Sequence, residues 1–288
     1  MGKLIRLDTE LVRRGMAPSR TQAANLIANQ RVFVDGILAD KPARQVDKAQ
    51  AIVLKEADDQ LDYVSRGAHK LEGALRYLED NGHEVPHIEG AVCLDAGAST
   101  GGFTDVLLRR GAARVFAVDV GYGQLDWRLQ SDERVVNIER TNVRTLDPDL
   151  IQPKADVVVG DLSFISLRLV LPALVNAAHK QASFLLMVKP QFEVGKEKVG
   201  KGGVVREPRE HLASMMSVAE KAMDLGLRVD AVAPSPLPGP AGNVEYFLSM
   251  RAKGTLPLTL YGEALESACK AAILAGPASV ELKGTNVT

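Results

Sequence analysis

The sequence predicts an α/β protein with a mainly parallel seven-stranded sheet and helices on both of its faces, preceded by a small N-terminal α+β domain. From residue 91 onward, short apolar runs alternate with segments of helix length, as in doubly wound parallel sheets. One run is followed directly by a glycine-rich turn and a helix, within Ala91–Thr104. The first 48 residues carry nine Lys or Arg and five Asp or Glu, although the whole chain has a net charge of −1. A basic N-terminal domain is therefore expected beside the sheet domain.

Length and composition suit two unequal globular domains. The chain has 288 residues, of which 46% are hydrophobic. Two cysteines are too few for a disulfide framework or a metal cluster, which favours a reducing compartment and no bound metal. No stretch has the length and apolar character of a signal peptide or a membrane span, so we expect a cytoplasmic protein without a membrane partner. We also expect a monomer. The expected segments are a basic domain at 1–60, a linker at 61–65, the sheet domain at 66–254, and a C-terminal helix with a polar tail at 255–288.

The basic domain is predicted to contain two helices, a hairpin and a final strand. Helical patterns cover residues 4–15 and begin again at Ser19. An Asp-Gly turn lies between two apolar runs within residues 32–38, which is a hairpin signal. The last strand is expected at Ala51–Leu54. A basic helical face on so small a module indicates binding to nucleic acid through electrostatic attraction.

The turn after the first strand of the sheet suits a nucleoside-like ligand. Gly97, Gly101 and Gly102 leave the backbone accessible where the next helix begins. Their spacing is G-x-x-x-G-G rather than the G-x-G-x-x-G of dinucleotide sites, and Asp95 stands two residues before the first glycine. Carboxylates repel phosphate and attract cations, which favours S-adenosylmethionine (SAM) with its positive sulfonium and ammonium groups. The pattern is that of class I SAM-dependent methyltransferases.

Further polar residues follow the other strands. Asp119 ends the second strand about 20 residues beyond the first glycine, where nucleoside-binding sheets place a carboxylate for ribose hydroxyls; a cap or turn role is the alternative. Because the carboxyl ends of parallel strands meet at one edge of a sheet, Asp119, Asn142, Asp161 and Lys189 are expected to share a site. The residues predicted to bind SAM are Asp95, Gly97, Ser99, Gly101, Gly102, Phe103, Asp119, Asn142 and Asp161.

The segment after Lys189 is predicted to be a mobile loop. Residues 192–208 contain four glycines and several charges. Such a loop acts as a lid over the site, contacts RNA, or is a plain flexible linker.

The N-terminal domain resembles a known RNA-binding module, the one named after the fourth protein of the small ribosomal subunit. The resemblance covers about residues 4–46 and is carried by the motifs RLD, SR at Ser19-Arg20, and VxVDG. It implies RNA rather than DNA as the partner. Arg6, Arg14 and Arg20 are the predicted phosphate contacts.

The rest of the chain resembles FtsJ-type ribose 2′-O-methyltransferases, and both domains together resemble the TlyA family of bacterial rRNA methyltransferases. The matching motifs are SRGAHKL, DAGASTGGFT, DVGYGQL, ERTN, DLSFISL, VKPQFEVG and SPLPGPAGNVEYF. The resemblance implies catalysis by Lys70, Asp161, Lys189 and Glu245. It also implies that the target is the 2′-hydroxyl of a cytidine in 16S or 23S rRNA, or in both, within free rRNA or ribosomal subunits. The chain departs from some relatives at LDYV, before Ser65, where they carry a basic residue and a tryptophan.

The chemistry of ribose methylation suits this residue set. A ribose hydroxyl is a poor nucleophile at neutral pH, so a base must remove its proton as the methyl group is transferred. A lysine acts as a base only in its neutral form, which burial and a second nearby amine favour, as for Lys70 beside Lys189. Asp161 and Glu245 then balance the charge and orient the amines.

Other classes of protein fit the sequence less well. Methyltransferases of exocyclic base amines carry a proline pair after the fourth strand, whereas this chain has DLSF. Carbon-five pyrimidine methyltransferases need a nucleophilic cysteine, and Cys93 falls inside the first strand. A pore-forming haemolysin, suggested by an old name of the family, needs no SAM site. A pseudouridine synthase with the same RNA-binding module would work without SAM.

Overall fold

The computed structural model describes residues 4–17, 19–28, 31–54, 63–252 and 260–276. The chain divides into two compact units, residues 1–66 and 67–288, and each is described by itself. The predicted polar tail lies outside the described residues, as do the first two residues of the predicted linker.

The N-terminal unit packs two helices against small sheets. Helices α1 (Leu7–Arg13) and α2 (Arg20–Ala28) confirm the two predicted helices, although α1 begins three residues later than expected. The reason is that the preceding residues form a short strand that pairs with a second one, which the sequence analysis missed. The predicted hairpin and final strand are present and form one sheet in the order β3-β2-β5. The strands are β1 (Ile5–Arg6), β2 (Val32–Val34), β3 (Ile37–Leu38), β4 (Gln45–Val46) and β5 (Ile52–Leu54).

Turn chemistry fixes two corners of this unit. Asp35 and Gly36 both have positive φ, 52° and 78°, as a two-residue hairpin turn requires. Gly15 ends the first helix with a φ of 70°. The buried side chains of Leu7 and Leu11 pack with Val32 and Val34 in one small core.

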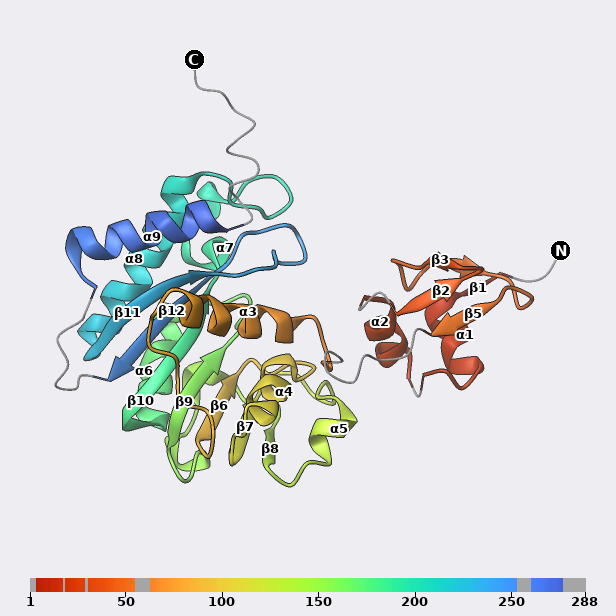
Figure 1. The fold of residues 1–288 in the computed structure, drawn as a ribbon, viewed down its shortest axis with the longest axis horizontal. Coiled ribbons are helices and arrows are strands. Elements are labelled where there is room, and N and C mark those ends of the chain that lie inside the picture. The colour runs from red at the N-terminus through yellow and green to blue at the C-terminus, as the bar shows by residue number, and fades with distance from the viewer. Residues whose placement is uncertain (1–3, 18, 29–30, 55–62, 253–259, 277–288) are drawn as a thin grey trace, which may run out of the picture. The chain divides into compact units, whose positions relative to one another are not determined.

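The second unit is built on a seven-stranded sheet, as predicted (Figure 1). The strand order is β11-β12-β10-β9-β6-β7-β8, and β12 runs in the direction opposite to the other six strands. The order reverses beside β6, which is where ligands bind in open α/β sheets. The strands are β6 (Val92–Ala96), β7 (Arg114–Val118), β8 (Val135–Ile138), β9 (Ala155–Gly160), β10 (Ala178–Val188), β11 (Leu227–Pro234) and β12 (Tyr246–Ala252).

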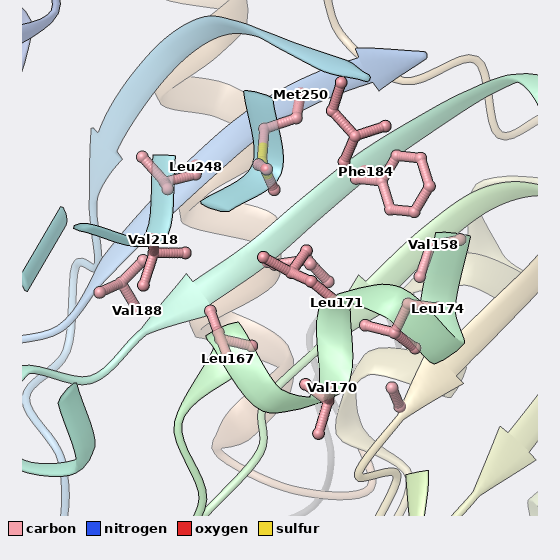
Figure 2. Packing of buried hydrophobic residues seen from close by; sticks show 14 of the residues in the cluster. Val158, Leu167, Val170, Leu171, Leu174, Phe184, Val188, Val218, Leu248 and Met250 are labelled. Carbon is pink, nitrogen blue, oxygen red and sulfur yellow. The ribbon is translucent and has the colours of Figure 1, made fainter. Parts of the chain in front are cut away.

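Helices cover both faces of this sheet (Figure 1). On one face, α6, α8 and α9 contribute to a single apolar core with alternate residues of the strands; Figure 2 shows part of it, including Leu171, Phe184 and Leu248. Each fully buried side chain of this kind stabilises the fold by roughly 1.5–3 kcal/mol. The helices are α3 (Gly67–Asp80), α4 (Gly102–Arg109), α5 (Trp127–Gln130), α6 (Leu167–Ala177), α7 (Pro190–Glu193), α8 (Pro208–Asp224) and α9 (Gly262–Ala275), with 3-10 turns at Val143–Thr145, Pro148–Leu150 and Lys196–Lys198.

The C-terminal helix belongs to this core. Leu265, Cys269 and Ile273 of α9 are buried in the same cluster as the strands. Within the described residues, no helix has both the length and the apolar character needed to span a membrane.

Candidate active site

Polar residues gather at the carboxyl edge of the sheet, as the topology predicts. Asp119, Asp161 and Lys189 directly follow β7, β9 and β10. A cavity of about 480 Å³ opens there, within the range typical of small-ligand sites. Both polar and apolar residues line this cavity. The lining residues are Gly97, Ser99, Asp119, Val120, Gln124, Thr141, Asn142, Val143, Asp161, Leu162, Ser163, Phe164, Ile165 and Val170.

Asp119 organises the polar part of the cavity lining. One carboxylate oxygen accepts a hydrogen bond from the backbone N–H of Ser99 at 2.9 Å, and the other accepts from Gly121 at 2.7 Å. Ser99 has a φ of 50°, so this turn holds an unfavourable backbone conformation in place. Each carboxylate oxygen has a second lone pair, so both can also accept from a ligand hydroxyl.

Gly97 is needed because the turn after β6 lies close to the residue that follows β9. Its φ is 85°, and a Cβ atom there would lie 3.0 Å from the carbonyl oxygen of Asp161. Any other residue at this position would push the turn away from Asp161 and change the shape of the cavity. Asn142 also lines the cavity, and its side chain accepts from the N–H of Arg144 at 3.0 Å.

Asp95 is fully buried beneath the turn and does not line the cavity. Its Oδ2 accepts from the Thr104 hydroxyl at 2.7 Å, whereas Oδ1 accepts no hydrogen bond from the described residues. Burial raises the pKa of Asp95 to about 7, and the charges of Asp161 and Asp119 add to the rise. A positive group near Oδ1 would favour the ionised form.

Three of the predicted SAM ligands support the turn rather than line the cavity. Gly101 has a φ of 96°, and a Cβ atom there would lie 2.1 Å from a methyl group of Leu129, so this glycine permits close packing. Gly102 is buried as the first residue of α4. Phe103 is also buried, and its ring stacks on that of Phe247 with centroids 6.1 Å apart. These residues do not line the cavity, and their part in binding SAM stays a prediction.

The four residues predicted to be catalytic lie in one cluster, although they come from distant parts of the chain. Lys70 lies in the first turn of α3, and its amine is 2.5 Å from Glu245, which directly precedes β12. The same amine is 3.8 Å from Asp161, which also forms a close ion pair with Lys189. The two lysine side chains are only 6% and 9% exposed. Two amines and two carboxylates therefore alternate in a largely buried chain at the cavity.

Residues that the sequence analysis did not single out surround Lys189. Its amine donates to the Ser163 hydroxyl at 2.9 Å and lies 6.0 Å from the centre of the Phe192 ring. The ring of Phe164 is 5.3 Å from that of Phe192, is 91% exposed, and belongs to a residue with a φ of 63°. The motif DLSF next to Asp161 contains Phe164, whose positive φ is uncommon for a bulky residue.

The segment predicted to be a mobile glycine-rich loop is anchored at both ends. Its first residues form α7, where Glu193 is buried. Farther along, the N–H of Val205 donates to Asn243 at 3.1 Å, and the Asn243 amide donates to the carbonyl of Gly203 at 2.8 Å. His211 contacts Val205 as well, at 2.9 Å from the carbonyl oxygen. The expectation of a loop holds for the glycines between these anchors, and the anchors themselves were missed.

The three arginines predicted to contact RNA are ion-paired within their own unit. Arg6 and Arg20 both bind Asp8, at 2.7 and 3.1 Å, and more than two fifths of each side chain remains exposed. Arg14 binds Glu10 at 2.8 Å and donates to the carbonyl oxygens of residues 48 and 50, both at 3.0 Å. Arg14 therefore supports the fold of the module, and phosphate contact by the three arginines stays a prediction.

Comparison with known proteins agrees with this geometry. The family described as FtsJ-like methyltransferase matches residues 63–252, and the S4 domain matches residues 5–52. The 16S/23S rRNA (cytidine-2′-O)-methyltransferase TlyA of Mycobacterium tuberculosis is 52% identical over 277 residues, which cover 96% of this chain and all of the relative. Hemolysin A of Brachyspira hyodysenteriae is 34% identical over 84% of this chain and 98% of its own length.

A solved structure extends the likeness to the fold of the whole chain. A protein of Streptococcus thermophilus that is named a hemolysin has a TM-score of 0.72 and 34% identity, and the match covers 99% of this chain and 98% of that one. The matching family covers about two thirds of the sequence, and the relatives are covered almost from end to end. This chain therefore belongs to the FtsJ-like methyltransferases and, among them, to the TlyA family with its N-terminal S4 domain.

Proposed function

We propose that this protein transfers a methyl group from SAM to the ribose 2′-hydroxyl of a cytidine in ribosomal RNA. The observation that carries the proposal is the buried cluster of Lys70, Glu245, Asp161 and Lys189 beside an amphipathic cavity. The name of the Mycobacterium tuberculosis relative specifies the same reaction on 16S and 23S rRNA.

The cavity has the chemical character that SAM requires. Asp119 is positioned to accept from ribose hydroxyls, while Val120 and Ile165 offer apolar surface to a base. Ser99 and Asn142 add further polar groups to the lining. The unpartnered oxygen of Asp95 lies beneath the turn and favours a positive charge above it. When bound, SAM supplies an electrophilic methyl group.

Lys189 is the proposed base, or the group that directly positions the attacking hydroxyl. Asp161 holds its amine from one side and Ser163 accepts a hydrogen bond from it at 2.9 Å, so the direction of the amine is fixed. Its burial excludes water that would compete for the ribose hydroxyl. A fixed amine of this kind lowers the barrier by removing the proton and by orienting the nucleophile.

Lys70 and Glu245 complete the electrostatic balance. The Lys70 amine lies between two carboxylates, at 2.5 Å from Glu245 and 3.8 Å from Asp161. Lys70 thus offsets part of the charge on Asp161 and helps to hold this carboxylate in place. We assign Lys70 and Glu245 the task of positioning the Asp161–Lys189 pair.

RNA is proposed to bind through the N-terminal S4 domain together with the rim of the cavity. Exposed arginines at positions 6 and 20 suit phosphate contacts, because a guanidinium binds phosphate oxygens in pairs. Exposed Phe164 offers a ring on which a base removed from its stack can lie.

The test is methylation of purified ribosomal subunits and of free rRNA with labelled SAM, followed by mapping of 2′-O-methyl cytidine. We expect marks that depend on the wild-type protein and that disappear with Lys189→Met. Arg76→Ala, which changes an exposed arginine on α3, serves as the control variant. Methylation of a base instead of a ribose would contradict the proposal. Because two relatives have hemolysin names, leakage of dye from liposomes should be measured in parallel, and we expect none.

A further inference from the structure

Glu193 is a buried carboxylate to which the proposed reaction assigns no task. Its side chain is 1% exposed. One oxygen accepts from the backbone N–H of Leu167 at 2.7 Å, and the other accepts from the Ser166 hydroxyl at 2.5 Å. Both carboxylate oxygens are therefore occupied by the residues that open α6, whereas Glu193 itself ends α7.

The start of α6 suits an anion. The first N–H groups of a helix have no partner within it, and the helix dipole is positive at that end. Arg168 reinforces the contact, because its Nε lies 3.4 Å from the Glu193 carboxylate and its Nη2 donates to the Glu193 carbonyl at 3.3 Å. The end of α7 is thus held to the start of α6 by four contacts through both main chain and side chain.

The two segments joined in this way begin at catalytic residues. Four residues separate Asp161 from Ser166, and all four line the cavity. Three residues separate Lys189 from Glu193 and form the rest of α7. The two segments are linked at their start by the Asp161–Lys189 ion pair and at their end by Glu193.

Further contacts join the two segments between their linked ends. Lys189 donates to Ser163, and the rings of Phe164 and Phe192 lie 5.3 Å apart. Asp161 and Lys189 end strands, so their backbones are fixed on one side by the sheet. On the other side, their position depends on how the segments that follow Asp161 and Lys189 are held against each other.

We propose that Glu193 is a positioning residue for methyl transfer: by closing the two segments against each other it sets the mutual position of Asp161, Lys189 and the cavity wall. The proposal rests on the proposed function, since it concerns the same transfer. A displacement of the reacting groups by about 1 Å costs on the order of 10²-fold in rate. Removing the closure should therefore affect the chemical step more than the binding of either substrate.

The experiment compares Glu193→Ala with Glu193→Gln in the full-length protein. Glutamine has the same length, so its carbonyl oxygen can accept from Leu167 and its amide can donate to Ser166. With saturating SAM and ribosomal RNA, we expect Glu193→Ala to lower the single-turnover rate about 10- to 100-fold and Glu193→Gln to stay within about threefold of wild type. The Kd of SAM and the KM for RNA should change by less than about fivefold in both.

Asp230→Ala is the matched control for simple loss of a buried carboxylate. Asp230 is paired at 3.0 Å with both Arg228 and Arg251 on β11 and β12, so its removal should lower the melting temperature with little effect on the rate. Amide hydrogen exchange of residues 162–168 reports on the closure without any activity. We expect faster exchange there in Glu193→Ala only.

Two results would overturn the proposal. The first is a wild-type rate in Glu193→Ala, with or without a lower melting temperature. The second is an equal loss in the alanine and glutamine variants. Both are read against active wild-type protein, so they are distinct from failure of the proposed function, in which the wild-type protein itself would methylate no ribose.

Discussion

Both units of this molecule contain carboxylates that are buried and ion-paired, but their cations differ in exposure. In the N-terminal unit, Asp8 and Glu10 are buried, while the arginines that bind them reach the surface. At the sheet edge, the side chains of Lys70 and Lys189 are only 6% and 9% exposed. The first arrangement leaves positive charge displayed at the surface, and the second confines it within the fold.

The two units also differ in the pKa values of their buried carboxylates. The hydrogen bond from Arg13 lowers the pKa of Glu10 to about 2, and the hydrogen bond from Arg6 holds the pKa of Asp8 well below its usual range. These carboxylates stay ionised, so the arginines around them keep a fixed direction. At the sheet edge, burial instead raises the pKa of Asp95 to about 7, so a charge there depends on what binds. The carboxylates of the N-terminal cluster are thus permanently ionised, whereas Asp95 changes its protonation near neutral pH.

The largest expected effect tests the buried cluster. Lys189→Met should lower the methyl-transfer rate on the order of 10²- to 10⁴-fold, because it removes the proposed base while the shape of the side chain is largely kept. Binding of SAM, measured by calorimetry, should hardly change. Combined with Lys70→Ala, the loss should be much smaller than the product of the two single losses, because groups that act as a unit are not additive. Full activity of Lys189→Met would show that positioning by RNA contacts carries the reaction.

The next effect concerns stability. Glu245→Ala leaves the buried Lys70 amine with only the distant Asp161 carboxylate, so the free energy of unfolding should fall by about 3 kcal/mol. Replacing both members, Lys70→Met with Glu245→Leu, should cost less than Glu245→Ala alone because no unpaired charge remains. Urea unfolding followed by the fluorescence of Trp127, the one tryptophan of the chain, measures both. A double variant less stable than Glu245→Ala would contradict this account of the pair.

Much of this architecture could be predicted from the sequence, because the spacing of hydrophobic residues and the residue types at turns are local features of the chain. The apolar run at Ala155–Gly160 forms β9, since a strand buried on both faces is continuous in hydrophobicity. The ends of such strands converge by topology alone, so the sequence could bring Asp161 and Lys189 together. Lys70 and Glu245 were identified only by resemblance to a family, because α3 and β12 are distant in the chain from both.

Other features depend on contacts that no local pattern encodes. The glycine turn predicted a ligand for Gly101 and Phe103, but it could not distinguish a residue that faces the cavity from one that packs beneath it. The two residues of β1 are too few for a period of two to appear. Glu193 is one of three acids in a glycine-rich segment, and its partners lie 26 and 27 residues earlier. Exclusion of water from a carboxylate is a tertiary property, which only the assembled fold determines.

A smaller effect is expected for the cavity wall. Asp119→Ala removes two hydrogen bonds to backbone N–H groups and the proposed ribose contact, so SAM should bind about 10- to 100-fold more weakly, since a hydrogen bond to a charged group contributes roughly 1.5–3 kcal/mol. Asp119→Glu keeps an acceptor and should lose less. Calorimetry with both variants makes the comparison. Equal affinity in Asp119→Ala and wild type would show that the ribose is held elsewhere.

The smallest effect concerns the exposed cations of the N-terminal unit. Replacing Arg6 or Arg20 by alanine should reduce the slope of log affinity for RNA against log salt concentration by about 0.7 to 0.9 each, as for the loss of one phosphate contact. Arg14→Ala should leave this slope nearly unchanged, because its guanidinium is already engaged by Glu10 and by two backbone carbonyls; its removal should instead loosen the module. Arg76→Ala on α3 controls for the general loss of one positive charge. Equal slopes for wild type and for a variant lacking both Arg6 and Arg20 would mean that these arginines only shape the unit around Asp8. In that case the contrast between displayed and confined charge would be one of exposure alone, and the RNA would have to be held by other cations.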